Sequence, residues 1–264
     1  MDQVFLKTRE LGQALVESDI YKTMKAAEDK AMANTDAAET MSKYMEIRGE
    51  LQKMLSEAEP DANKMQSLSD ELIAAYGELK HLMPALHLPV QSGNDEILRR
   101  MNRVYDRAHY LETVEKLRKV CPEIGLTSDI IVGFPGETEA QFEDTLSLVR
   151  QVRYDAAYTF IYSPRVGTRA ASMPDDTPAE EKSRRITRLI EVVQGICSET
   201  LQAQVGKRET VLVESVSLRD AGSVGGKTPR GHMVNFPGNA DLIGKFVDVE
   251  ITSAGRNTLK GRMI

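Results

Sequence analysis

LTSDIIVGFPGE, residues 126–137, is a run of apolar and β-branched residues that ends in a glycine-rich segment. Continuous apolar runs of this kind are typical of strands in a parallel sheet, which is covered on both faces. Helical patterns at 107–120 and 139–152 flank the run, and further apolar runs lie at 87–90 and 156–162. Strand–helix–strand alternation indicates parallel strands joined by crossover helices. The sequence therefore predicts an α/β segment, with a further short helix at 96–101.

Each of the three predicted strands ends in a polar or glycine-rich segment. These are Gln91-Ser92-Gly93, Gly133–Glu137 and Ser163–Thr168. Ligands of parallel α/β sheets and barrels bind at the carboxyl ends of the strands, and glycines there let the backbone approach a ligand closely. We therefore predict one shared ligand site at this edge, with ordinary strand-to-helix turns as the alternative.

Three polar side chains near these strands are candidate site residues. Asp129 lies inside an apolar strand, where a carboxylate needs either a basic partner or a ligand to bind. Arg165 follows the third strand and is either a clamp for a phosphate or carboxylate or a solvated loop residue. His87 is either packed or part of the site wall, and no spacing of histidines or cysteines predicts a metal site.

Residues 1–80 are predicted to be helical throughout. Apolar residues recur at helical spacing in four stretches, which begin near Val4, Ile20, Met41 and Met65. Methionine is an adaptable core residue and also suits partner surfaces, so this segment is either a simple helical core or a core with a partner-binding face. No residue in it has a catalytic pattern.

Polar residues mark the expected ends of these helices. Ser18-Asp19 is placed to cap the second helix. Thr35 or Asp36, together with Glu39, is placed to form a capping box for the third. We expect Glu59-Pro60-Asp61 to separate the third helix from the fourth.

The last third of the chain is predicted to be one long helix followed by a small β-barrel. The helix covers about 179–204 and ends before Gly206. Short strands are expected at 210–216, 233–236, 246–251 and 258–263, with a turn at 222–226, and strands of this number and length suggest a closed barrel.

Composition limits the remaining possibilities. The 264 residues carry a net charge of −6, but residues 205–264 hold three more basic than acidic residues, a weak indication of a polyanionic partner. No apolar run is long enough to cross a membrane, so we expect no membrane partner and a cytoplasmic protein. Cys121 and Cys197 are far apart and match no metal-binding spacing.

Three segments resemble consecutive signatures of the MiaB-type tRNA methylthiotransferases, which are radical S-adenosylmethionine (SAM) enzymes. The segments are HLPVQSGNDEILRRMNR (87–103), TSDIIVGFPGETEAQFEDTL (127–146) and YDAAYTFIYSPRVGTRAASMP (154–174). The resemblance implies that residues 77–204 form part of a radical-SAM (β/α) barrel. It also implies that residues 205–264 form a TRAM domain, the RNA-binding β-barrel of this family. The fold class is thus α/β with an all-α segment, residues 1–76, at its start.

The resemblance also implies a chemistry. Such enzymes cleave SAM at a 4Fe-4S cluster and place a methylthio group on an isopentenyl-adenosine beside the tRNA anticodon. The cofactor side of the partial barrel would then be lined by Gln91, Ser92, Asp129, Gly133, Pro135 and Gly136. Tyr162 and Arg165 would lie near the cofactor or the target nucleotide.

The TRAM resemblance implies contacts with the tRNA anticodon stem-loop. Its central strand is matched by GKTPRGHMVNF (226–236), with Lys227, Arg230 and Asn235 as phosphate or base contacts. Phe236 would be either barrel core or a stacking surface. Together with Arg165, these are the predicted RNA-binding residues.

The sequence departs from the methylthiotransferase pattern in two ways. The printed sequence contains no CxxxCxxC, the motif that supplies the thiolate ligands of the radical-SAM cluster, and only two cysteines in all. Residues 1–76 resemble instead the YlbF/YmcA group of small helical bacterial regulators, which implies a helical protein partner. We therefore expect a methylthiotransferase by family that performs no chemistry alone. The alternatives are a non-catalytic RNA-binding regulator and a truncated reading frame of two adjacent genes.

Overall fold

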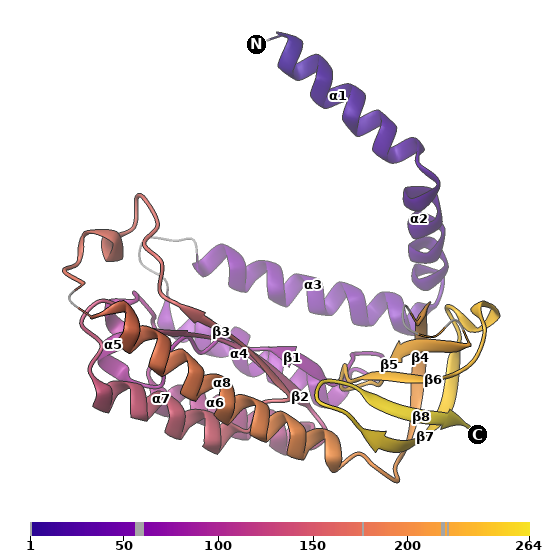
Figure 1. Ribbon diagram of the computed structural model, residues 1–264. Helices are drawn as coiled ribbons and strands as arrows, with labels where there is room; N and C mark the ends of the chain where they lie inside the picture. Colours follow the sequence, from indigo (N-terminus) through magenta and orange to yellow (C-terminus); the bar gives the residue numbers. More distant parts are fainter. Residues whose placement is uncertain (1, 56–60, 176, 218–219, 221) are drawn as a thin grey trace. The chain divides into compact units, whose positions relative to one another are not determined.

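The computed structural model describes residues 2–55, 61–175, 177–217, 220 and 222–264 (Figure 1). The chain divides into two compact units, residues 1–82 and 83–264. The first unit is helical and the second combines a parallel sheet with a closed barrel, so the predicted fold class is confirmed.

Within its described residues, 2–55 and 61–82, the first unit contains four helices. They are α1 (Asp2–Glu17), α2 (Asp19–Met32), α3 (Thr35–Leu55) and α4 (Ala62–Glu78). The burial in this unit comes from α3 and α4, where Ile47, Ile73 and Ala75 are buried. In α1, by contrast, the apolar residues are exposed, as Phe5 and Leu11 show, and α2 has no buried residue.

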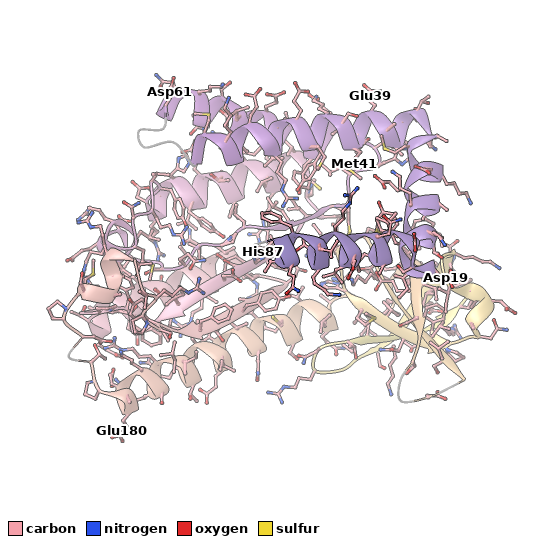
Figure 2. The ribbon with its side chains drawn as sticks, turned by 90° about the horizontal axis from the view of Figure 1, so that it is seen from above. Asp19, Glu39, Met41, Asp61, His87 and Glu180 are labelled. Atoms are coloured by element: carbon pink, nitrogen blue, oxygen red, sulfur yellow. The ribbon has the colours of Figure 1, made fainter. Side chains whose placement is uncertain are left out.

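The helix caps agree with the sequence in part. The Ser18 hydroxyl accepts a hydrogen bond from the Tyr21 amide, which confirms the predicted cap of α2. The capping box predicted from Thr35 or Asp36 with Glu39 is wrong. The cap is Asn34, whose side chain accepts a hydrogen bond from the Ala37 amide, and α3 begins at the next residue, Thr35. Asp61 caps α4 (Figure 2), while Glu59 and Pro60 lie outside the described residues.

The α/β part of the second unit has a three-stranded parallel sheet in the order β1-β2-β3. Its elements are β1 (Ala85–His87), α5 (Asp95–Arg100), α6 (Arg107–Val120), β2 (Gly125–Val132), α7 (Glu139–Val152), β3 (Ala156–Ile161) and α8 (Ala179–Gln202). The first strand begins and ends earlier than the predicted 87–90, because Pro89 has no amide hydrogen to extend the ladder. Two short 3₁₀ helices, Arg169–Ser172 and Ala240–Leu242, complete the unit's helical elements.

The two faces of the sheet differ in burial. Along β2, alternate residues from Leu126 to Val132 are buried, and the helices lie against this face (Figure 1). The residues between them, including Asp129 and Ile131, are only half-buried. On β3, Tyr158 and Phe160 are exposed. The second face of this sheet is thus much less covered within the unit than the first.

The barrel closes through five strands in the order β4-β5-β6-β8-β7. They are β4 (Arg208–Val216), β5 (Ser223–Lys227), β6 (Met233–Pro237), β7 (Phe246–Ala254) and β8 (Leu259–Met263). The turn predicted at 222–226 is wrong, since this segment forms β5. A side chain at Gly226 would put its Cβ 2.3 Å from the Leu212 carbonyl oxygen, so the glycine is needed for close strand packing. Val224 and Phe236 are buried in the barrel core.

None of the helices within the described residues is both long and apolar enough to span a bilayer.

The burial pattern predicts unequal protection in hydrogen exchange. Amides of α2 should exchange much faster than those of β2, because α2 buries no side chain and short isolated helices are marginal in water. Exchange monitored by mass spectrometry tests this directly. Protection of α2 equal to that of β2, at protein concentrations where the chain is monomeric, would contradict it.

Candidate functional site

The parallel pairing brings the carboxyl ends of the three strands to one edge of the sheet. Gln91 bridges to Ile130 beyond the end of β1, and the Tyr162 amide donates to the Val132 carbonyl beyond the end of β3. The Gly133–Glu137 turn follows β2 between them. The predicted strand-end segments therefore lie along a common edge, as the topology requires.

The turn after β2 is held by a buried carboxylate. Gly133 has a φ of +68°, and its amide donates to Glu137 Oε2 at 2.7 Å. Arg185, on α8, places Nη1 3.1 Å from the same oxygen and 2.7 Å from the Glu137 carbonyl oxygen. Both side chains are almost fully buried. A residue from α8, far away in sequence, thus fixes the shape of the glycine-rich turn.

Opposing effects act on the pKa of Glu137, and burial is the largest of them. Burial raises its pKa above the ordinary value, although the Gly133 amide and the Arg185 charge oppose that shift. Its second oxygen, Oε1, is buried and has no hydrogen-bond partner among the described residues. The carboxylate is therefore stable in its charged form only while Arg185 stays in place.

Pro135 and Gly136 are held from α5. The Arg100 guanidinium donates to the Pro135 carbonyl oxygen and lies over the Phe134 ring. Gly136 has a φ of +72°, and a Cβ there would come within 3.1 Å of Arg100 Nη1. The backbone of this turn is therefore packed against the Arg100 guanidinium.

Gln91 and Ser92 lie on the segment that leaves β1. Gln91 has a φ of +67°, unusual for a residue with a side chain, and its amide donates to the Asp129 carbonyl oxygen. Ser92 is fully buried and its hydroxyl lies 3.4 Å from Thr145 Oγ1 on α7. The backbone strain at Gln91 is the sort of feature that accumulates at functional sites, whereas the Ser92 hydroxyl is engaged within the fold.

Asp129 lies on the less covered face of the sheet and has a basic neighbour. Its Oδ2 is 3.5 Å from His87 Nε2, and His87 Nδ1 is 2.9 Å from Thr127 Oγ1. The His87 ring also meets Tyr158 edge-on. His87 is labelled in Figure 2. These residues form a half-exposed polar patch beside the exposed Tyr158 ring.

Arg165 is exposed in the loop after β3. The loop is closed by Thr168, whose amide and hydroxyl both donate to the Arg165 carbonyl oxygen. The structure thus brings Arg165 to the strand-end edge without tying down its side chain, and its role as an RNA contact stays a prediction.

The four predicted RNA contacts of the barrel have different environments. Lys227 is exposed and 3.3 Å from Glu214, and Asn235 faces outward beside Lys260 of the neighbouring strand. The Arg230 guanidinium is instead engaged with Asp155 at 2.8 Å. Phe236 is a core residue, 1% exposed, so its ring is not a stacking surface. GKTPRGHMVNF is a hairpin made of the end of β5, a turn and β6, and not a single central strand.

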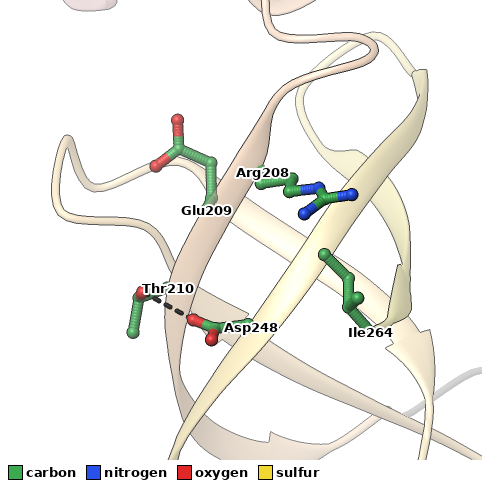
Figure 3. Close-up of a pocket in the computed structure, with 5 residues that line it drawn as sticks. All are labelled: Arg208, Glu209, Thr210, Asp248 and Ile264. Atoms are coloured by element: carbon green, nitrogen blue, oxygen red, sulfur yellow. Dashed lines mark hydrogen bonds between the residues drawn. The ribbon is translucent and has the colours of Figure 1, made fainter.

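The barrel also has a shallow hollow near its last residue (Figure 3). It is lined by Arg208, Glu209, Thr210, Asp248 and Ile264, and the Thr210 hydroxyl donates to Asp248 at 2.7 Å. This hydrogen bond between neighbouring strands is within the barrel wall and leaves the hollow with mixed polarity. Nothing in it has the geometry of a catalytic group.

Sequence reasoning missed the residues that hold the site in place. Glu137 belongs to the quoted glycine-rich motif, yet its burial and its pairing with Arg185 could not be foreseen from an amphipathic helix pattern. Asp155 and His232 were equally unmarked. The only available signals were that Asp155 directly precedes a predicted strand and that Glu137 ends the glycine-rich segment after another.

The comparisons with known proteins bear on this geometry. A model of the radical SAM superfamily matches residues 18–149, half of the chain. The chain belongs to the radical SAM superfamily. A TRAM domain model matches residues 202–264, the region of the closed barrel. Membership of the superfamily implies SAM and a 4Fe-4S cluster as cofactors.

Curated relatives match three quarters of this chain and are much longer than it. A tRNA-2-methylthio-N(6)-dimethylallyladenosine synthase from Clostridium botulinum (strain Langeland) is 49% identical over 199 residues, which are 75% of this chain and 44% of that protein. The synthase from Magnetococcus marinus is 46% identical over 197 residues, 75% of this chain and 45% of that protein. The chain thus spans less than half the length of these relatives.

One solved structure is also similar. Coproporphyrinogen III oxidase (HemN) from Escherichia coli, a radical SAM enzyme, matches 49% of this chain and 29% of its own at a TM-score of 0.40 and 22% identity.

The described residues do not fit a 4Fe-4S cluster. Among them, no group of three His, Cys, Asp or Glu side chains could hold a metal ion. Burial raises the pKa of both Cys121 and Cys197, which disfavours the thiolate that a cluster requires.

The Glu137–Arg185 pair yields a stability prediction. Arg185→Ala should lower the free energy of unfolding by about 3–5 kcal/mol, because it leaves a buried carboxylate without its counter-charge. Arg184→Ala on the same helix should change it little, since Arg184 is exposed. Urea unfolding of both variants measures the difference.

The same pair predicts a pH dependence. The pKa of Glu137 is raised in the folded state, so its protonated form favours folding below the ordinary carboxyl pKa and that contribution is lost as the pH rises. The deficit of Arg185→Ala should therefore grow between acidic and neutral pH. An equal deficit at both would contradict the assignment.

Proposed function

We propose that residues 83–264 act as the SAM-side and RNA-binding portion of a tRNA methylthiotransferase, whose product carries a methylthio group on an isopentenyl-adenosine next to the anticodon. One observation carries the proposal. A parallel sheet with a glycine-rich strand-end edge is joined within one unit to a closed five-stranded barrel matching the TRAM domain. The proposal is supported by the curated relatives that match 75% of this chain, because they are named as synthases of this modified nucleoside in tRNA.

The proposed cofactor residues would work mainly through the backbone. Pro135 and Gly136 present main-chain atoms, and Gln91 is held in a left-handed conformation at the edge. Asp129, with His87 beside it, offers a carboxylate near the exposed rings of Tyr158 and Phe160. An amphipathic nucleoside such as SAM needs this combination of a polar anchor and an apolar wall.

The RNA grip would come from exposed residues of the barrel, with Arg165 at the sheet edge. Lys227 and Asn235 lie on outward positions of β5 and β6, and Lys260 lies beside Asn235. Cations on a closed barrel suit a phosphate backbone, which gives affinity with little sequence preference. Because tRNA would be its substrate, the proposal requires that the protein works in the cytoplasm.

The helices of residues 1–76 are proposed to bind a helical protein partner. The exposed apolar side chains of α1, among them Phe5, Leu11 and Leu15, support this proposal. The resemblance to the YlbF/YmcA group is a separate reason to expect it. A role in catalysis is not proposed for this unit.

The proposal predicts salt-dependent tRNA binding. Lys227→Ala should reduce the slope of log K against log salt by about one, because one phosphate contact is lost. Lys7→Ala, which removes the same charge from an exposed position of α1, is the matched control and should leave the slope unchanged. Filter binding across a salt series measures both. No tRNA affinity at low salt would overturn the RNA-binding half of the proposal.

A second candidate function is a non-catalytic RNA-binding regulator, which the cysteine content favours. Anaerobic reconstitution with iron and sulfide followed by iron counting separates the two. We expect no stoichiometric iron on this chain alone, because two distant half-buried thiols cannot hold a cluster. Iron approaching a full cluster per chain, with SAM cleavage, would show that the chain is active by itself.

A further inference from the structure

We propose that Asp155, Arg230 and His232 form a joint that fixes the RNA-binding barrel on the amino-terminal edge of the sheet, and so sets where bound RNA lies relative to the strand-end edge. The positional part of this inference stands on the geometry alone. The part that concerns RNA rests on the proposed function.

The joint is centred on one buried carboxylate. Asp155 Oδ1 lies 2.8 Å from Arg230 Nη2 and 2.8 Å from His232 Nε2, both from the barrel. Its other oxygen, Oδ2, accepts from the Leu126 amide at 2.9 Å. The side chains of Asp155 and His232 are only 5% and 7% exposed. A single carboxylate thus joins the start of β2 to two barrel residues.

The barrel presents these two residues on a rigid turn. The turn Thr228–His232 is closed by hydrogen bonds from the Thr228 amide to the His232 carbonyl and from the His232 amide to the Thr228 hydroxyl. Gly231 within it has a φ of +85°. Arg230 and His232 are therefore held in place before they meet Asp155, which favours a specific contact over an adventitious one.

A glycine on the sheet makes room for this turn. A Cβ at Gly125 would lie only 2.8 Å from the Arg230 carbonyl oxygen, backbone that cannot move aside cheaply. Arg230 is also 3.5 Å from Glu123, just before this glycine. The close backbone approach at Gly125 and the ion pair at Glu123 therefore both hold Arg230 against the start of β2.

The barrel has a second attachment through α8. Leu201, near the end of that helix, belongs to the barrel core, and Gln194 accepts a hydrogen bond from Arg256 of the barrel. The barrel core itself is closed and independent of Asp155. Loss of the joint should therefore leave the barrel folded but free to pivot about the end of α8.

The position of the joint gives such a pivot consequences for bound RNA. Asp155 precedes β3 and contacts the start of β2, whereas the Gly133–Glu137 turn follows the end of β2. Eight residues of strand separate these edges, about 25 Å at the usual rise of a strand. A tilt of ten degrees at one end moves a rigid ligand by roughly 4 Å at the other, and misplacement of about 1 Å is already costly in catalysis.

The joint can be tested on the full chain without RNA. Spin labels are placed at His109→Cys on α6 and Asn257→Cys on the barrel, both exposed, in a Cys121→Ser, Cys197→Ser background. Double electron–electron resonance should give one narrow distance distribution for the parent and a broader or shifted one for Asp155→Ala. Asp248→Ala, which removes an exposed barrel carboxylate, is the control and should leave it narrow.

A second variant guards against simple unfolding. Gly125→Ala acts from the opposite side, because it pushes the Arg230 turn away but removes no charged group. We expect the same broadening, with the barrel's circular dichroism unchanged. If both variants kept the narrow distribution of the parent, or if both unfolded the barrel, the joint would be refuted.

The RNA arm separates this inference from the proposed function. With tRNA bound, Asp155→Ala should change affinity by less than about threefold, because exposed phosphate contacts carry most of it. Cleavage of the tRNA by an iron chelate tethered at Val166→Cys should shift to other nucleotides. Absence of tRNA binding in the parent would defeat the proposed function alone, whereas bound tRNA with an unshifted cleavage pattern in Asp155→Ala would defeat the part of the inference that concerns RNA.

Discussion

The buried pair of Arg185 and Glu137 is the contact on which the strand-end edge depends. Without Arg185, the Glu137 carboxylate, which accepts the hydrogen bond from the Gly133 amide, would be an uncompensated charge in a nearly dry site. Because Arg185 lies on α8, the turn after β2 takes its shape from a helix that begins some forty residues later. Glu180, at the start of the same helix, marks the end that approaches this edge (Figure 2).

Asp155, at the opposite edge of the sheet, is likewise a buried carboxylate with basic partners, but its pKa shifts in the opposite direction. Burial would raise the pKa of Asp155, but the His232 hydrogen bond, the Arg230 charge and the Leu126 amide outweigh it and lower that pKa. For Glu137, the effect of burial is larger than the opposing effects of the Gly133 amide and Arg185, so the pKa is raised. The difference arises because Asp155 uses both oxygens, whereas Oε1 of Glu137 has no partner among the described residues. Asp155 thus favours the folded state above the ordinary carboxyl pKa, and Glu137 below it.

The sequence predicted what depends on local pattern and missed what depends on distant partners. The helices at 107–120 and 139–152 were predicted with their observed bounds, because amphipathic periodicity is a local property of the sequence. The segment at 222–226 looked like a turn because it is rich in glycine, yet those glycines serve the close packing of β5 against β4. The TRAM resemblance implied that Arg230 contacts RNA, which stays a prediction, but its pairing with Asp155, seventy-five residues away, could not be read from local pattern.

The uncovered face of the sheet connects these observations. A purely parallel sheet is normally covered on both faces, yet here Tyr158 and Phe160 are exposed within the unit. The chain also spans less than half the length of its curated relatives. The same face carries Asp129 and His87 beside the strand-end edge. A ligand bound on this face would therefore meet the Asp129 carboxylate, the His87 ring and the exposed aromatic rings together, and its own burial of these groups would strengthen their charge interactions.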